Sequence, residues 1–257
     1  MSHLIKMFLL LLILTTSCKK KEAPQSSVNL APQVKNTIQD KRAAVLATSM
    51  LNAMGGQEKW DSLNYVSWTF FGARHLVWDK KGGRVRIDSP RDTSIYLVDL
   101  NNLKGKVIKG GKEVTDPEEL TNLLERGKSI WINDSYWLFM PFKLWDSGVN
   151  VIYMREDTMV GGMPASVLAL TFNEVGDTPE NKYEIYLDKK DNLIKQWAFF
   201  KDAHQKTPSK IWPWDNYKSH YGLLLSSERS DNGGPSDVRV YDELNDAVFE
   251  SFEKFDY

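Results

Sequence analysis

The residues of this chain best suited to catalysis are its histidines and its cysteine. Their spacing matches no catalytic pattern. His75, His204 and His220 lie far apart in the sequence. There is no HExxH pair to hold zinc on a helix and no GxSxG turn to expose a nucleophilic serine. Glycine pairs occur without a phosphate motif and predict turns. We therefore expect no catalytic residue, no metal site, no cofactor and no enzymatic activity.

Cys18 is the one cysteine of the chain, and its surroundings indicate acylation. Lys6 and a short apolar run at 7–14 come first, and small residues including Ser17 directly precede the cysteine. The run is shorter than the ~20 residues that span a bilayer. This pattern resembles a bacterial lipoprotein signal peptide, residues 1–17, with Cys18 as the lipidated first residue of the mature chain. Thr15 stands where such signals usually have leucine, so an uncleaved anchor or an ordinary secretory leader remains the alternative.

A lipoprotein of this kind is held on a membrane by its N-terminal acyl chains, palmitate among them. We expect a monomer in the cell envelope, on the outer rather than the inner membrane, with its domain in the periplasm or at the cell surface. The formal net charge of −1 gives no reason to expect a nucleic acid partner. Residues 18–37 are polar and predict a flexible tether, and residues 38–257 predict a single domain.

Two regions of the chain carry helical patterns. Apolar residues recur at helical spacing between Ile38 and Met54, and a glycine pair follows as a stop. Asp116, Pro117 and Glu119 form the start of a second helix, with an N-cap, a first-turn proline and a capping-box glutamate. A separate aromatic segment at 130–142 is too apolar to stand uncovered in water.

Alternating apolar and polar residues predict strands through most of the rest of the chain. Such short strands, separated by glycine and asparagine turns, favour a mainly β (α+β) fold with one strongly bent antiparallel sheet. The predicted strands are Tyr65–Phe71, Arg74–Asp79, Arg84–Asp88, Ser94–Leu100, Lys104–Ile108, Val149–Arg155, Ala165–Asn173, Lys182–Asp188, Leu193–Phe200, Tyr221–Glu228 and Val238–Tyr241.

The order of these elements resembles the LolA/LolB-like lipoprotein-carrier fold. The likeness rests on a helix ending at 53–56, Trp60, a strand meander, a helical insertion and a returning meander, and it covers about residues 38–252. The segments 136–144 and 175–179 are similar, more specifically, to a family of uncharacterised LolA-like lipoproteins. The resemblance implies an incomplete β-barrel with a helical lid around a hydrophobic cavity.

By this resemblance the ligand would be a lipid or the acyl chain of another lipoprotein. The residues expected to line the cavity are Trp68, Phe70, Trp78, Ile87, Tyr96, Trp131, Trp137, Phe139 and Phe142. The same side chains would serve equally well to fill a dry core, since each buries roughly 150 to 250 Å².

Two other functions stay open at this stage. Trp212 and Trp214 stand beside Asp215, and exposed tryptophans next to a carboxylate are suited to stacking on sugar rings. This pattern favours a surface glycan-binding lipoprotein as the alternative. An accessory lipoprotein that grips a protein partner is the other.

Overall fold

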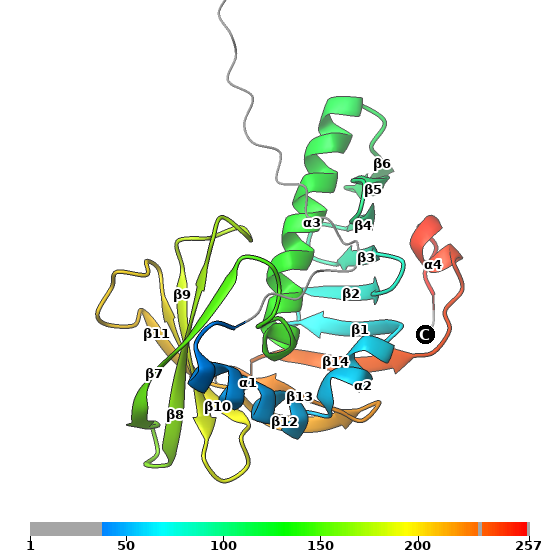
Figure 1. Cartoon of the computed structure of the whole chain (residues 1–257). Helices are drawn as coiled ribbons and strands as arrows, with labels where there is room; N and C mark the ends of the chain where they lie inside the picture. The colour runs from blue at the N-terminus through cyan, green and yellow to red at the C-terminus, as the bar shows by residue number, and fades with distance from the viewer. Residues whose placement is uncertain (1–37, 231–232, 256–257) are drawn as a thin grey trace, which may run out of the picture.

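The computed structural model describes residues 38–230 and 233–255, and the chain is mainly β with a few helices (Figure 1). Within these residues the strands form antiparallel sheets, and none of them closes into a barrel. The predicted signal peptide at 1–17, the lipidation site Cys18 and the tether at 18–37 lie outside the described residues. The mainly β fold that the sequence predicts is confirmed.

The first sheet has seven strands in the order β14-β1-β2-β3-β4-β5-β6. Consecutive strands form a meander, while β14 returns from the far end of the chain to pair with β1. Its strands are β1 Tyr65–Phe70, β2 Arg74–Asp79, β3 Arg84–Ser89, β4 Ser94–Asp99, β5 Lys104–Lys109, β6 Lys112–Glu113 and β14 Pro235–Tyr241.

A second sheet of five strands has the order β11-β10-β9-β8-β7, and β12 and β13 form a separate pair. The predicted single sheet is thus divided into three, as expected when a long sheet twists and splits. These strands are β7 Val149–Thr158, β8 Pro164–Phe172, β9 Lys182–Asp188, β10 Ile194–Phe200, β11 Lys210–Pro213, β12 Asp215–His220 and β13 Leu223–Glu228.

The helices are α1 Lys41–Ala53, α2 Gly56–Ser62, α3 Pro117–Phe139 and α4 Ala247–Glu250, with a 3-10 turn, η1 Met140–Phe142, after α3. The start predicted for α3 is confirmed, because the Asp116 carboxylate accepts a 2.8 Å hydrogen bond from the amide of Glu119. The aromatic segment at 130–142 continues the same helix instead of forming a separate element. Its buried residues Leu124, Trp131 and Leu138 repeat at a spacing of seven, which keeps one face of the helix apolar over its length.

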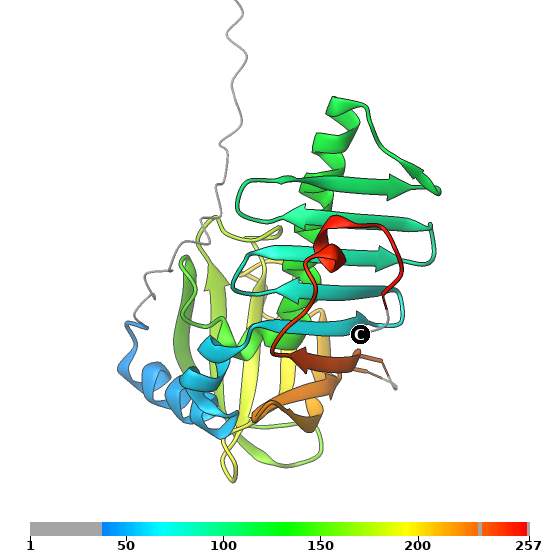
Figure 2. The same cartoon turned by 90° about the vertical axis from the view of Figure 1, so that its right-hand side faces the viewer.

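α3 lies across one face of the seven-stranded sheet, and α4 covers the opposite face (Figure 2). The core under α3 is aromatic: the Phe139 ring lies 5.3 Å from Trp60 and 5.5 Å from Trp68, between ring centroids. The C-terminal half of α3 continues toward the five-stranded sheet (Figure 1). α3 therefore connects the core of one sheet to the inner face of the other.

α1 packs against β7, the edge strand of the five-stranded sheet. The Asp40 carboxylate and an ion pair between Arg42 and Glu156 join the two elements. Asp40 Oδ1 caps the helix by accepting from the amides of Arg42 and Ala43, and Asp40 Oδ2 accepts a 2.9 Å hydrogen bond from the amide of Tyr153 on β7. None of the described helices is both long enough and apolar enough to cross a membrane.

Candidate ligand-binding site

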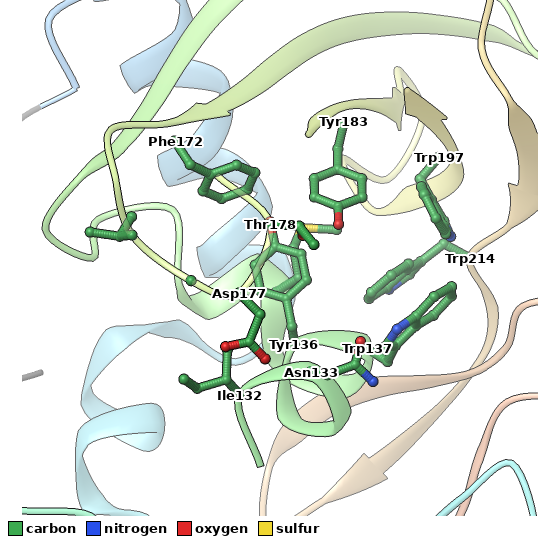
Figure 3. Close-up of a pocket in the computed structure, with 13 residues that line it drawn as sticks. Ile132, Asn133, Tyr136, Trp137, Phe172, Asp177, Thr178, Tyr183, Trp197 and Trp214 are labelled. Atoms are coloured by element: carbon green, nitrogen blue, oxygen red, sulfur yellow. The ribbon is translucent and has the colours of Figure 1, made fainter. Parts of the chain in front are cut away.

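A pocket of about 130 Å³ lies where the C-terminal half of α3 meets the five-stranded sheet. The loop that follows β8, residues 173–181, borders it on one side (Figure 3). Its walls are Ile132, Asn133, Tyr136, Trp137, Met140, Phe172, Val175, Gly176, Asp177, Thr178, Tyr183, Trp197 and Trp214. The surface of this pocket is dominated by aromatic rings.

The helix wall follows from the periodicity of α3 and its continuation into η1. Ile132, Asn133, Tyr136, Trp137 and Met140 are spaced by one, three, one and three residues, so they share one face of the helical stretch. This is the face that points away from the seven-stranded sheet toward the second sheet. α3 has apolar residues on two faces, and each face is covered by one of the two sheets.

The strand wall is made by rings that face the helix from β8, β9 and β10. The Tyr183 ring lies 5.7 Å from Phe172 and 5.4 Å from Trp197, both in edge-on geometry. Across the pocket, Tyr136 lies 5.5 Å from Tyr183, and Trp137 lies 5.1 Å from Trp197. Edge-on and tilted contacts at these distances are favourable for aromatic pairs, so the rings hold one another in place.

Polar groups gather at the mouth of the pocket. Asp177 and Asn133 are exposed there, and the three tryptophans gather on the side away from Asp177 (Figure 3). The Asp177 carboxylate accepts a 2.6 Å hydrogen bond from the hydroxyl of Ser129 on α3. The pocket is therefore apolar inside and polar at its entrance.

The two tyrosines in the wall are uncharged at neutral pH. Burial raises the pKa of Tyr136 well above its ordinary value, and burial likewise raises the pKa of Tyr183. A phenolate is a poor fit to this environment because a charge removed from water without a partner is costly. The tyrosine rings thus act as neutral surfaces.

The structure brings one of the nine predicted cavity residues, Trp137, into this pocket. Phe70 is half-buried and packs on Phe71 and Arg74. The other seven, Trp68, Trp78, Ile87, Tyr96, Trp131, Phe139 and Phe142, are buried in the main core. Ligand contact stays a prediction for this set, and Trp137 is the member placed to make it.

Phe172, Tyr183 and Trp197 line the pocket and were not predicted as site residues. Each was predicted to lie in a strand, and the returning meander has an aromatic residue near the middle or end of each of these strands, which was the available signal. Trp214 was considered for a surface glycan site. It is 2% exposed and forms part of the pocket wall, so it is not available to stack on a sugar at the surface.

Groups suited to catalysis do not gather at the pocket. His75 lies on β2, and burial lowers its pKa. Across the described residues, no group of three or more histidine, cysteine, aspartate or glutamate side chains is placed to hold a metal ion.

No family model and no curated protein matches this chain. Among solved structures, a DUF1329 family protein from Desulfovibrio piger ATCC 29098 is similar at 16% identity and a TM-score of 0.43, over 84% of this chain and 98% of that one. A putative outer membrane lipoprotein-sorting protein domain from Vibrio parahaemolyticus is similar at 14% identity and a TM-score of 0.37, over 79% and 97%. MucB is similar at 17% identity and a TM-score of 0.27, over 64% and 54%.

Proposed function

We propose that this chain is a membrane-anchored lipoprotein of the cell envelope that binds the apolar part of a lipid-like ligand and carries out no reaction on it. The observation that carries the proposal is the pocket of about 130 Å³ lined by six aromatic side chains, Tyr136, Trp137, Phe172, Tyr183, Trp197 and Trp214.

The size of the pocket limits what it encloses. An engineered cavity of about 150 Å³ in another protein binds benzene, and sites for drug-sized ligands span about 300–1,000 Å³. A pocket of about 130 Å³ therefore holds one ring or the end of an acyl chain. The remainder of a longer ligand would lie outside the mouth.

The energetics favour reversible holding of such a ligand. Each methylene moved from water into an apolar site contributes ~0.8 kcal/mol, whereas transfer from a bilayer contributes almost nothing because lipid is equally apolar. A pocket held near a membrane by acyl chains on Cys18 would exchange its ligand with that membrane.

A substitution that fills the pocket tests this proposal. Val175 lines it, and Val175→Phe adds a ring to the available space. Val160 is 77% exposed on the turn after β7, so Val160→Phe makes the same change outside the pocket. We expect a fluorescent fatty acid to bind the wild type and Val160→Phe alike, and to bind folded Val175→Phe at least about tenfold more weakly, the equivalent of ~1.4 kcal/mol. Equal binding by all three proteins, or no binding by the wild type, would contradict the proposal.

A further inference from the structure

Arg229 lies directly behind the pocket wall and is fully buried, at 0% exposure. Its guanidinium carbon stands 3.4 Å from the centroid of the Trp214 ring, a residue of the wall. Among the described residues no carboxylate forms an ion pair with it, and its Nε has no hydrogen-bond partner. A buried cation without an anion is costly, so its presence here calls for an explanation.

The remaining donors of Arg229 are taken up by oxygen atoms of the backbone and one hydroxyl. Nη2 donates to the carbonyl of Trp137 at 2.5 Å and to that of Ser226 at 3.1 Å. Nη1 donates to Ser226 Oγ at 2.7 Å and to the carbonyl of Glu228 at 2.6 Å. The Trp137 carbonyl needs such a donor because residue 141, its partner in an ideal helix, is a proline without an N–H.

These contacts neutralise no charge. Burial lowers the pKa of Arg229 to about 9, and the side chain still carries its proton at pH 7. Arg86 provides the contrast within the same chain: it is 2% exposed, and Asp88 Oδ2 accepts from its Nε at 2.8 Å. One buried arginine therefore has an anion, and the arginine behind the pocket has none within residues 38–230 and 233–255.

Other donors of the same wall also lack acceptors. The hydroxyl of Tyr136 and the indole nitrogens of Trp197 and Trp214 are buried, with no hydrogen-bond partner in the described part of the chain. An indole N–H can only donate, so what these tryptophans lack is an acceptor. The buried indoles of Trp68, Trp78 and Trp131 in the main core lack acceptors as well, so the unpaired cation behind the wall is the observation that points to an acidic ligand group.

The charges around the pocket have opposite effects at its two ends. Asp177 is exposed at the mouth, where water and salt screen its charge. Arg229 is enclosed in protein, where screening is weak and a charge acts over a longer distance. The wall between them carries no charged side chain, so the charge of Arg229 is the less screened of the two.

We propose that the pocket prefers an apolar group that bears an acidic, hydrogen-bond-accepting head such as a carboxylate, and that Arg229 sets this preference. The inference rests on the proposed function and names the chemistry of its ligand. Arg229 acts through Trp214 and Trp137, whose positions it fixes, and through its charge. It is a positioning residue, since the ring of Trp214 stands between its guanidinium and the pocket.

Two sources supply this chemistry, a fatty acid and an aromatic acid. The test uses the full chain in lipid nanodiscs and isothermal titration, with empty nanodiscs as the blank. Octanoate, octan-1-ol and octylammonium form one series, and benzoate and benzyl alcohol form the other. We expect the wild type to bind the acid at least about tenfold more tightly than the alcohol in one series or both, a ratio that one well-placed charge supplies. The series whose acid binds more tightly shows whether the ligand is a fatty acid or an aromatic acid.

Variants of the two buried arginines separate positioning from folding. Arg229→Met removes the unpaired buried cation but leaves the Trp137 carbonyl without its donor, so the variant is compared only after urea denaturation shows that it is folded. We expect it to reduce the acid-to-alcohol ratio to within about threefold of one, and Arg229→Lys to restore part of the ratio because it restores the charge. Arg86→Met should leave the ratio unchanged, whatever it does to stability.

The outcomes distinguish the two proposals. If no ligand of either series binds, the proposed function falls and this inference falls with it. If octan-1-ol binds as tightly as octanoate, and benzyl alcohol as tightly as benzoate, the proposed function stands and the acidic preference is refuted. A preference that survives in folded Arg229→Met refutes the role of Arg229.

Discussion

The hydroxyl of Ser129 donates a 2.6 Å hydrogen bond to Oδ2 of Asp177. Ser129 lies on α3 one turn before the pocket face, and Asp177 lies in the loop after β8 that borders the mouth. This hydrogen bond links the loop at 173–181 to the helix. We therefore expect access to the pocket to depend on that contact.

Removing the Ser129 hydroxyl should loosen the loop without unfolding the protein. A hydrogen bond contributes a net ~0.5–1.5 kcal/mol, so in Ser129→Ala we expect amide hydrogen exchange at 175–178 to accelerate about two- to tenfold. Ligand release should accelerate with it. Ser62→Ala, which removes a hydroxyl bonded to the carbonyl of Lys59, is the control and should leave this loop unchanged. Unaltered exchange in Ser129→Ala would show that the contact does not hold the loop.

Gly127 has a packing role that outweighs its poor helix propensity. It lies within α3, where a Cβ would meet Val98 Cγ2 at 2.9 Å and Tyr96 Cδ1 at 3.3 Å. Alanine gains ~1 kcal/mol of helix propensity, whereas overpacking a core costs ~1–3 kcal/mol. We expect Gly127→Ala to lower the free energy of unfolding in urea by up to about 2 kcal/mol. The exposed change Asn122→Ala on the same helix should be neutral or slightly stabilising, and a stabilised Gly127→Ala would refute the close packing.

The buried Asp134 should make stability depend on pH. Arg74 donates to its two oxygens at 2.8 and 2.9 Å, and the carboxylate is 0% exposed. Burial, the largest effect, raises the pKa of Asp134 above its usual 3.8 despite this partner. The folded state therefore keeps a proton that the unfolded state releases, and this contribution to stability is lost as the pH rises above 3.8 through the folded pKa.

Asp134→Asn removes this titration while retaining an oxygen for Arg74. We expect the wild type to lose unfolding free energy relative to Asp134→Asn as the pH rises from 3.5 to 7. Urea denaturation at several pH values measures it. Parallel pH profiles for the two proteins would show that Asp134 does not titrate differently on folding.

The anchor predicted at Cys18 is tested by cell fractionation. Cys18→Ala cannot be acylated, so we expect the variant to leave the membrane fraction and the wild type to incorporate labelled palmitate. Ser17→Ala keeps a small residue before the cysteine and should fractionate like the wild type. Membrane retention of Cys18→Ala together with an unlabelled wild type would contradict the lipoprotein prediction.

Local patterns of the sequence predicted most of the elements. β2 and β9 have the predicted bounds, because alternation and flanking turns determine them within a few residues. β6, β11 and β12 were missed: β6 and β11 are only two and four residues long, and β12 is mostly polar. The division into separate sheets was also missed, because it depends on which strands pair and not on the pattern within any strand.

The pocket was the least predictable part. The sequence marks Tyr136 and Trp137 as residues of an aromatic segment, but the register that brings Tyr183 and Trp197 opposite them is set by long-range packing. The environment of Arg229 is likewise set by long-range packing. Nothing in its neighbours along the chain indicates that it is enclosed, and its partner Trp137 is 92 residues away.

The bond between Asp40 and the amide of Tyr153 also bears on self-association. An unprotected edge strand offers its free amides to any extended segment of another molecule, which begins domain swapping or fibril growth. On β7 one of those amides is already occupied by a side chain from α1, and a bulge between Tyr153 and Arg155 breaks the regular spacing beside it. A neighbouring copy therefore finds no continuous ladder to extend on β7.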